Sequence, residues 1–229
     1  MKVLQTAQKI LLHFDTRRKF FRSLSNARRV LDLGCGFGKN CLELRELFPN
    51  MEFYGVDLLE KNTIPEFINY QKLDLNVSSL PYPNDFFDAI MFIHVIEHLE
   101  RPLFLGNEIK RVLKPGGRIY LETPNWTTMF VPSFGYKREQ GYPFNFFDDH
   151  THVKPWSKHG LFVYLSQTCA ISVEKAGTCR NWLRFLLDPF IIIAAILKGD
   201  RAYLVSSFWN LYGWCIYAIG KKEFHENPS

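Results

Sequence analysis

Val30-Leu31-Asp32-Leu33-Gly34-Cys35-Gly36-Phe37-Gly38 is the most informative segment of this chain. Its apolar first half predicts a buried strand, and the glycines predict a tight turn directly after it. The residues from Lys39 to Phe48 carry apolar side chains at spacings closer to those of a helix than of a strand. A strand, a glycine-rich turn and a helix in this order open a nucleotide-binding α/β domain.

Two features distinguish this turn from the loop that binds a dinucleotide. Its glycines are spaced G-x-G-x-G rather than G-x-G-x-x-G, and Asp32 stands just before the first of them. A buried carboxylate there would repel a pyrophosphate, whereas it suits a cationic group such as the ammonium of an amino acid. The segment therefore argues against a nicotinamide-dependent oxidoreductase.

Two further acids follow in the chain at the ends of expected strands. Asp57 closes an expected strand over Glu52–Asp57, about twenty residues beyond the glycine turn, where an acid can accept hydrogen bonds from a ribose diol. Asp74 lies in a third expected strand over Gln71–Leu75. Such acids suit a nucleoside ligand, although Asp57 alone does not choose between NAD and S-adenosylmethionine (SAM).

The middle of the chain predicts two more buried strands. Phe87-Asp88-Ala89-Ile90 and the apolar run after it indicate a central parallel strand that ends near Ile93 and His94. A helix is expected to begin at Glu97-His98-Leu99. A second, amphipathic helix should end sharply at Pro115-Gly116-Gly117, and a fifth strand is expected over Arg118–Glu122.

In this order, the motifs between Val30 and Asn125 resemble those of the class I SAM-dependent methyltransferases, and the resemblance continues more loosely to the C-terminus. It implies an α/β, Rossmann-like, doubly wound sheet of seven strands in the order 3-2-1-4-5-7-6, with the last strand antiparallel. It also implies SAM as the cofactor, with Asp74 on the adenine amino group and Leu58 and Leu75 against the adenine ring. The cofactor residues that the resemblance implies are Asp32, Gly34, Cys35, Gly36, Gly38, Asp57, Leu58, Asp74, Leu75, Ile93 and His94.

The whole chain, 1–229, is expected to form one domain. Its expected parts are an N-terminal helical cap (1–27), a cofactor-binding core (28–180), an apolar helical insertion (181–211) and the last strand (212–222). Ala202–Gly220 has no charged residue, yet its polar residues weaken a membrane-spanning interpretation. The apolar surface of the insertion is expected to form a substrate lid, a dimer contact or a peripheral contact with a membrane.

The acceptor side should be built from the long loop between Pro124 and Ser157. Its acid-Thr-His-Val-basic-Pro pattern is similar to that of bacterial methyltransferases assigned to sugars and cell-surface glycans. An oxygen acceptor benefits from a base, and histidine is the usual one near neutral pH. By location the candidates are His150 and His152, followed by His94, although each could instead be a structural hydrogen-bonding residue.

A metal site is a further hypothesis for the same region. Some O-methyltransferases with Glu-x-x-Glu-His at this point bind a divalent ion together with a later histidine. This chain has His94-x-x-Glu97-His98 and His152, so its first residue departs from that pattern. A divalent metal is therefore not favoured, and no metal ligand is assigned.

The composition indicates a cellular compartment and a kind of binding partner. The five cysteines form no CxxC pair, which indicates a reducing, cytoplasmic compartment, with 181–211 as the part that would touch the inner face of a membrane. The formal net charge is +5. A basic cluster suggests a phosphate-bearing or membrane-surface partner, or simply a solvated helix face. The cluster comprises Arg17, Arg18, Lys19, Arg22, Arg28 and Arg29.

Together these features favour methyl transfer to an oxygen of a sugar, a cell-surface glycan precursor, or another small or lipid-linked metabolite, with a role in polysaccharide biosynthesis. One alternative is an RNA-modifying 2′-O-methyltransferase, but the chain shows no separate RNA-binding module, so nucleic acid is a disfavoured partner. Another alternative is a SAM-binding protein without catalysis, since a fold does not fix a function.

Overall fold

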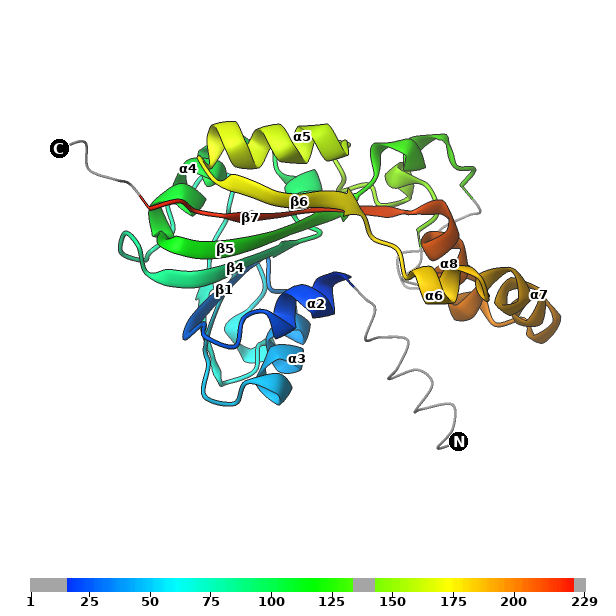
Figure 1. The fold of residues 1–229 in the computed structure, drawn as a ribbon, viewed down its shortest axis with the longest axis horizontal. Helices are drawn as coiled ribbons and strands as arrows, with labels where there is room; N and C mark the ends of the chain where they lie inside the picture. The colour runs from blue at the N-terminus through cyan, green and yellow to red at the C-terminus, as the bar shows by residue number, and fades with distance from the viewer. Residues whose placement is uncertain (1–15, 134–142, 225–229) are drawn as a thin grey trace.

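The computed structural model describes residues 16–133 and 143–224. Its centre is a seven-stranded sheet in the order β3-β2-β1-β4-β5-β7-β6 (Figure 1). The pairings from β3 to β5 are parallel, and β7 is antiparallel to both of its neighbours. This confirms the predicted Rossmann-like, doubly wound topology. The strands are β1 (Arg29–Leu33), β2 (Glu52–Asp57), β3 (Ile68–Lys72), β4 (Phe87–Ile93), β5 (Leu113–Pro124), β6 (Ser172–Thr178) and β7 (Cys215–Lys221).

Helices cover both faces of this sheet (Figure 1). On one face lie α2 (Thr16–Arg22) and α3 (Lys39–Leu47), and on the other lie α4 (Pro102–Val112) and α5 (Lys158–Val163). The alternation of side chains along each strand divides the core accordingly. In β1, Val30 packs with the α2 and α3 side, whereas Leu31 packs with the α4 and α5 side.

The third strand lies three residues earlier than the sequence predicted. It is β3, Ile68–Lys72, rather than Gln71–Leu75. Ile68 and Tyr70 are the buried members of this strand, so they, and not the later leucines, supply its inward-facing side. The chain has left the sheet at Asp74, whose Oδ1 accepts a hydrogen bond from the backbone N–H of Asn76 at 2.9 Å.

Two boundaries on either side of α4 also differ from the prediction. The helix expected at Glu97 is only a 3₁₀ turn, η2 (Ile96–His98), and α4 begins at Pro102, since proline favours the first turn of a helix. The helix ends at Val112, before the Pro-Gly-Gly segment. That segment belongs to β5, which pairs with β4 from Leu113 onwards and has an irregularity in register near Asp88.

The C-terminal insertion forms three helices beyond the carboxyl end of the sheet (Figure 1). They are α6 (Trp182–Phe185), α7 (Asp188–Lys198) and α8 (Arg201–Tyr212). Gly199 ends α7 in a left-handed conformation, and the side chain of Asp200 caps α8 at the N–H of Tyr203. No helix among the described residues is both long and apolar enough to span a bilayer.

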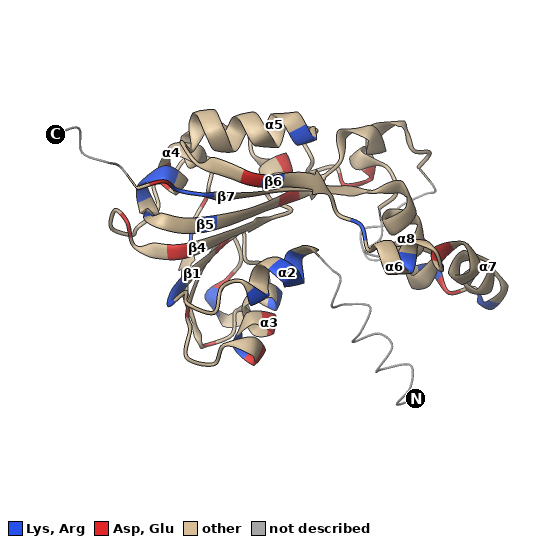
Figure 2. Ribbon diagram, viewed as in Figure 1, with Lys and Arg blue, Asp and Glu red and all other residues tan. Residues whose placement is uncertain are grey.

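Charge is unevenly distributed over this framework. Figure 2 shows basic residues gathered on α2, and Arg180 is the basic residue of the segment that leads from β6 into α6. The predicted amphipathic helix within residues 1–15 and part of the acceptor loop, residues 134–142, lie outside the described residues.

Candidate active site

The glycine turn after β1 has the backbone geometry that its sequence predicts. Gly34, Gly36 and Gly38 all have positive φ, at 67°, 51° and 74°. At Gly34 a Cβ atom would lie 2.2 Å from Cγ2 of Val95, so glycine is required there by packing within the protein itself. At Gly36 a Cβ atom would meet nothing within 4 Å. The turn therefore packs tightly on Val95 at Gly34, whereas at Gly36 nothing packs on it. This leaves space for a ligand beside the backbone of Gly36.

Asp57, at the end of β2, is held beside this turn by backbone N–H groups. Its Oδ2 accepts from Gly36 at 2.8 Å, and its Oδ1 accepts from Leu58 and Leu59 at 2.7 and 3.2 Å. These three bonds occupy both lone pairs of Oδ1 and one of Oδ2, so the second lone pair of Oδ2 can still accept a hydrogen bond from a ribose hydroxyl. The contact with Gly36 places this acid and the open side of the turn in one site.

Asp32 is fully buried beneath the turn, and its Oδ2 is contacted by Asn40 at 3.3 Å and by Cys41 at 3.8 Å. Its Oδ1 has no hydrogen-bond partner among the described residues. Burial raises the pKa of Asp32 to about 7, although Asn40 and the cationic Arg17 act in the opposite direction. A cationic ligand group near this carboxyl would stabilise its ionised form.

The other predicted cofactor residues differ in exposure. Leu58 is 64% exposed, whereas Leu75 is buried in the core on the α4 and α5 side, and Ile93 is buried at the end of β4. Cys35 is also buried, and burial raises the pKa of its thiol to about 12. Cys35 is thus a packing residue of the turn, with a thiol that stays protonated.

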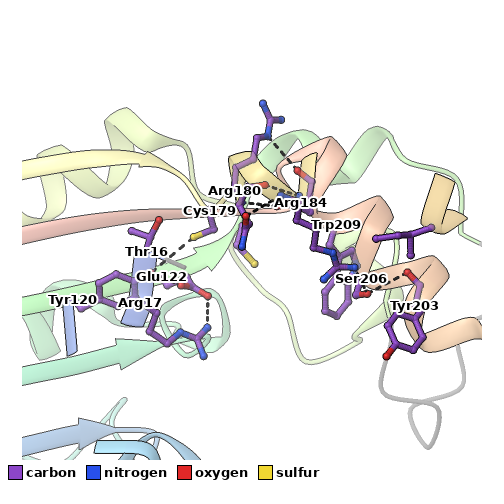
Figure 3. Close-up of a pocket in the computed structure, with 14 residues that line it drawn as sticks. Thr16, Arg17, Tyr120, Glu122, Cys179, Arg180, Arg184, Tyr203, Ser206 and Trp209 are labelled. Atoms are coloured by element: carbon purple, nitrogen blue, oxygen red, sulfur yellow. Dashed lines mark hydrogen bonds and ion pairs between the residues drawn. The ribbon is translucent and has the colours of Figure 1, made fainter. Parts of the chain in front are cut away.

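A cavity of about 560 Å³ lies at the carboxyl ends of β5 and β6, between α2 and the α6–α8 helices. Figure 3 shows Arg17, Tyr120 and Glu122 at one side of it, and Arg184, Ser206 and Trp209 at the other. This volume falls within the range of small-molecule sites. Because parallel strands of α/β sheets bind ligands at their carboxyl ends, the cavity is the candidate acceptor site.

The cavity contains a buried carboxylate, that of Glu122 on β5. Its Oε2 accepts a hydrogen bond from the Tyr120 hydroxyl at 2.5 Å, and its Oε1 pairs with Arg17 and lies 3.2 Å from Nε2 of His94. Burial alone would raise the pKa of Glu122, but Arg17 and His94 bring it below its usual value. The carboxylate is therefore ionised at neutral pH.

His94 connects the cavity with the rest of the site. It follows β4 with a positive φ of 55°, which is rare for a residue other than glycine and places its ring beside Glu122. Its Nδ1 lies 3.4 Å from Oε1 of Glu97, and its Nε2 lies 3.7 Å from Sγ of Cys215. Burial would lower the pKa of His94, but its contacts with Cys215, Glu122 and Glu97 raise it well above the usual value. His94 thus carries a proton.

The two other candidate bases occupy different surroundings. His150 is exposed in a turn and does not line the cavity. His152 is half-buried, and its Nδ1 lies 2.6 Å from the carbonyl oxygen of Phe146, which therefore accepts a hydrogen bond from it. Burial lowers the pKa of His152, so this ring is neutral at pH 7 and its Nε2 has a free lone pair.

Glu97, His98 and His152 form a cluster next to His94, with one potential ligand atom from each within 4.8 Å of the others. Oε2 of Glu97 accepts from the Thr123 hydroxyl at 2.9 Å, while its buried Oε1 makes only the 3.4 Å contact with Nδ1 of His94 among the described residues. The backbone N–H groups of Val153 and Lys154 donate to the carbonyl of Glu97, which holds the acceptor loop against η2.

Hydrogen bonds orient both rings of this cluster. The Thr151 hydroxyl donates to Asp149 at 2.6 Å, so toward His98, 2.9 Å away, it acts as the acceptor from Nδ1. Both His98 and His152 then present Nε2 lone pairs, as metal-binding histidines do. Two imidazoles and one carboxylate can hold a divalent ion. The predicted His94-Glu97-His98 group is divided, since His94 lies instead with Glu122 and Cys215.

Several cavity residues were not predicted from the sequence. Glu122 was seen only as the end of a strand, and Arg17 only as part of a basic segment. An acid directly after the apolar run Ile119–Leu121, at the end of an expected strand, was the available signal for Glu122. No local pattern distinguished the basic residues of the cavity wall, Arg180 and Arg184.

Comparison with known proteins identifies the family. A family model described as a methyltransferase domain matches residues 7–168, which is more than half of the chain. The chain belongs to the class I SAM-dependent methyltransferase family. The open backbone at Gly36 and the acids Asp32 and Asp57 fit SAM, which is the cofactor of this domain.

The relatives of this domain differ in what they act on. A tRNA U34 carboxymethyltransferase of Trichlorobacter lovleyi is 29% identical over 122 residues, which cover 48% of this chain and 38% of that protein. A ubiquinone biosynthesis O-methyltransferase of Dechloromonas aromatica is 29% identical over 107 residues, covering 43% of this chain and 45% of that protein. The chain thus spans less than half the length of these two curated relatives.

A solved structure extends the similarity of fold to nearly the whole chain. The SAM-dependent methyltransferase from Mesorhizobium loti superposes with a TM-score of 0.61 at 18% identity, over 89% of this chain and 96% of that one. At this identity the superposition supports the shared fold, and the acceptor has to be argued from the cavity.

Proposed function

We propose that this domain transfers a methyl group from SAM to a hydroxyl oxygen of a small or lipid-linked acceptor bound in the 560 Å³ cavity. The observation that carries this proposal is the ionised, buried carboxylate of Glu122, which lines the cavity and contacts His94, while the next residue, Val95, packs against Gly34 of the cofactor turn. The cofactor turn and the acceptor cavity are therefore adjacent, as direct transfer requires.

When bound, SAM supplies a methyl carbon on a positively charged sulfur, and the carbon–sulfur bond breaks as the acceptor oxygen bonds to that carbon. The contribution of the chain is mainly alignment of the two partners. Glu122 accepts a hydrogen bond from the acceptor hydroxyl and so points an oxygen lone pair toward the methyl group. The oxygen, once methylated, would be a far stronger acid than any carboxylic acid, so Glu122 takes its proton despite a low pKa.

Among the three candidate histidines, His94 has the position that this proposal needs. It already carries a proton, so it acts by positioning Glu122 rather than as the base. His152 has the neutral ring of a base, but its Nδ1 is bound to Phe146 and its Nε2 faces the Glu97 cluster. His150 does not line the cavity and lies in a turn of the acceptor loop.

The walls of the cavity support an acceptor with both polar and apolar parts. Arg184 and Ser206 make one wall polar, with the Ser206 hydroxyl donating to the carbonyl of Tyr203 and accepting from Arg184, whereas Ile191 and Trp209 offer apolar surface. This mixture suits a sugar, a cell-surface glycan precursor or another lipid-linked metabolite, and it supports a role in polysaccharide biosynthesis. A hydroxyl-bearing isoprenoid quinone precursor would be an equally amphiphilic acceptor.

The α6–α8 helices supply a surface for the apolar part of such an acceptor. Leu186, Phe190 and Leu197 are 70%, 71% and 83% exposed at this end of the molecule. We infer that this surface makes a peripheral contact with the inner face of a membrane. The membrane contact would be contradicted if all the protein were a monodisperse monomer that does not bind lipid vesicles. A stable dimer would indicate that the same surface contacts a second copy of the chain.

An RNA acceptor is the second candidate, since one relative bears a tRNA-modifying name and α2 is basic. On α2, however, Arg17 pairs with Glu122 and Arg18 pairs with Glu43, so part of this charge is neutralised within the protein. The small-molecule acceptor is therefore preferred.

The test is transfer of a labelled methyl group from SAM to pools of sugars, lipid-linked glycans, quinone precursors and unmodified tRNA. We expect label in a hydroxyl-bearing small or lipid-linked pool, stable to mild base as an ether is. Label only in tRNA would favour the second candidate. Binding of SAM without transfer to any pool would favour the non-catalytic alternative.

A further inference from the structure

A basic groove of about 280 Å³ lies beside the acceptor cavity, between α2 and the β6–β7 edge of the sheet. Its walls contain the basic residues Lys19, Arg118, Lys175 and Arg180, and none of the described residues that line it is acidic. At about 30 Å³ for each water, it has room for about nine waters. The groove is thus large enough for a phosphate or diphosphate group and has the charge to attract one.

Two of these cations have no acidic partner among the residues that the structure describes. Arg118 pairs with Glu174 at 2.6 Å, so its charge is already balanced. No carboxylate of the described residues lies within ion-pair distance of Lys175 or Arg180. The guanidinium of Arg180 donates instead to the carbonyl oxygens of Asn210 and Leu211, at 3.2 and 2.9 Å. Those bonds fix its position and leave its charge uncompensated.

Aromatic contacts stiffen the same residue. The guanidinium carbon of Arg180 lies 5.3 Å from the ring centre of Trp182 and 5.1 Å from that of Phe185. A guanidinium held by carbonyls and rings loses little conformational entropy when it binds an anion, because it is already ordered. Arg180 is therefore a prepared anion-binding group and not a mobile surface side chain.

The groove is continuous with the acceptor cavity. Thr16 and Arg180 line both. The ring of Tyr217, in the groove, stacks on the ring of Tyr120, in the cavity, with 6.0 Å between their centres. Tyr120 donates to Glu122. The stacked rings of Tyr217 and Tyr120 therefore separate an anion in the groove from the carboxylate of Glu122, to which the acceptor hydroxyl is proposed to donate a hydrogen bond.

We propose that the methyl acceptor carries a phosphate or diphosphate group, which binds in the groove through Lys175 and Arg180 while the hydroxyl to be methylated lies in the cavity beside Glu122. This inference rests on the proposed function and names the chemical class of its acceptor. The phosphate could belong to a soluble sugar phosphate or to the head group of a lipid-linked acceptor, and both present the same oxygens to the two cations.

The experiment titrates the full chain, saturated with S-adenosylhomocysteine, with inorganic diphosphate by calorimetry. A parallel arm measures cosedimentation with vesicles that contain an anionic phospholipid. The variant is Lys175→Ala, which removes an exposed cation whose side chain makes no hydrogen bond or ion pair with the described residues. Its matched control is Lys158→Ala, an exposed lysine at the start of α5 on the opposite face of the sheet. Arg180→Lys is a second variant that keeps the charge and loses the fixed geometry.

We expect saturable, salt-sensitive diphosphate binding that Lys175→Ala weakens about tenfold and Lys158→Ala leaves unchanged, with Arg180→Lys between them. If Lys175→Ala weakens the binding of diphosphate but not the cosedimentation with vesicles, the acceptor is a soluble phosphate compound. If Lys175→Ala also weakens cosedimentation, and free diphosphate competes with the vesicles, the phosphate belongs to a lipid head group. Absence of any Lys175-dependent binding in both arms, in protein that still binds S-adenosylhomocysteine, overturns the phosphate inference and leaves the proposed function standing. Loss of S-adenosylhomocysteine binding itself would instead contradict the cofactor assignment.

Discussion

Nε2 of His94 lies 3.2 Å from Oε1 of Glu122, across the boundary between the ends of β4 and β5. The histidine reaches this position only because its backbone is left-handed, with φ at 55°. Such conformations cost about 1–3 kcal/mol and tend to occur at functional sites. Arg17 and this contact together keep the pKa of Glu122 low, so the carboxylate stays ionised inside a cavity where burial would otherwise neutralise it.

Replacing Glu122 with Gln should abolish most methyl transfer while leaving cofactor binding nearly intact. The amide keeps the shape of the carboxylate but takes no proton and accepts a weaker hydrogen bond, so we expect a loss of about 100-fold or more in the rate of transfer. Calorimetry with SAM and transfer of a labelled methyl group measure the two effects. Glu46→Gln, an exposed glutamate on α3, is the control. Equal activity of both variants would exclude a role for Glu122 in the reaction.

Affinity for SAM should fall as the pH drops below about 7, because the cationic group of the cofactor prefers ionised Asp32, and burial raises the pKa of this carboxyl to about 7 in the free protein. The loss should approach tenfold per pH unit, the limit for one linked proton. Asp32→Asn should lower the affinity at pH 8 and remove most of the dependence. If the affinity of the parent protein for SAM did not change between pH 5 and 8, this role of Asp32 would be contradicted.

The stability of the free protein should depend on the protonation of Asp32 in the opposite direction: it should rise, not fall, as the pH drops. A carboxyl whose folded pKa is raised binds protons more tightly in the native state, so its stabilising contribution is complete below the unfolded pKa, near 3.8, and is lost as the pH rises through about 7. In paired melts between pH 5 and 8, the parent protein should lose stability relative to Asp32→Asn. An unchanged difference between the two would place the native pKa of Asp32 below this window.

The two glycines of the turn should respond differently to alanine. Gly36→Ala places a methyl group in open space at a positive φ, so it should cost about 1 kcal/mol of stability but weaken SAM binding at least tenfold. Gly34→Ala drives its Cβ to within 2.2 Å of Val95 and should destabilise the fold by several kcal/mol. Thermal melts and calorimetry on both variants make the comparison. Unimpaired cofactor binding by Gly36→Ala would show that the open side of the turn is not the ligand side.

The Glu97, His98 and His152 cluster should bind a divalent ion that cofactor binding does not need. Titration with Co²⁺ should give the visible spectrum of a nitrogen- and oxygen-ligated ion, and His98→Ala should remove it. Cofactor binding should be unchanged in excess chelator, because none of the three residues belongs to the glycine turn or to β2. His159→Ala, an exposed histidine on α5, should keep the spectrum. The absence of any Co²⁺ spectrum in the parent protein would assign the cluster a purely structural role.

The cofactor turn was predictable because its signals are local, whereas the sheet order was implied by the resemblance of the successive motifs to the methyltransferase family. Gly34, Gly36 and Asp57 belong to motifs in which the strand, the turn and the acid follow one another along the chain. The register of β3 was wrong, since the pattern of Asp74 and its neighbouring leucines was given more weight than the buried pair Ile68 and Tyr70. The segment after β4 was likewise predicted as a helix by analogy, whereas α4 starts only at Pro102.

The acceptor side was harder to predict because its residues meet across long separations. Arg17 and Glu122 are 105 positions apart, and nothing near either residue indicates the other. The histidine-rich loop drew attention to His150, which the fold leaves exposed away from the cavity. The acceptor cavity depends on how the α6–α8 helices pack beside the sheet. The sequence pattern of these helices indicates that they are apolar but not where they pack.

The central claim is that the turn after β1 and the acid after β2 bind SAM. Calorimetric titration of the purified chain with SAM, with NAD as the comparison ligand, tests it most directly, and Asp57→Ala is the variant to include. Loss of this carboxylate removes an acceptor for the ribose hydroxyls and should weaken binding about tenfold or more. Asp57→Asn, which keeps the shape of the side chain, separates lost charge from a disturbed turn.

We predict saturable binding of SAM by the parent protein, weaker binding by both Asp57 variants, and no binding of NAD. A folded protein that binds no SAM, or that binds NAD in its place, would contradict the account.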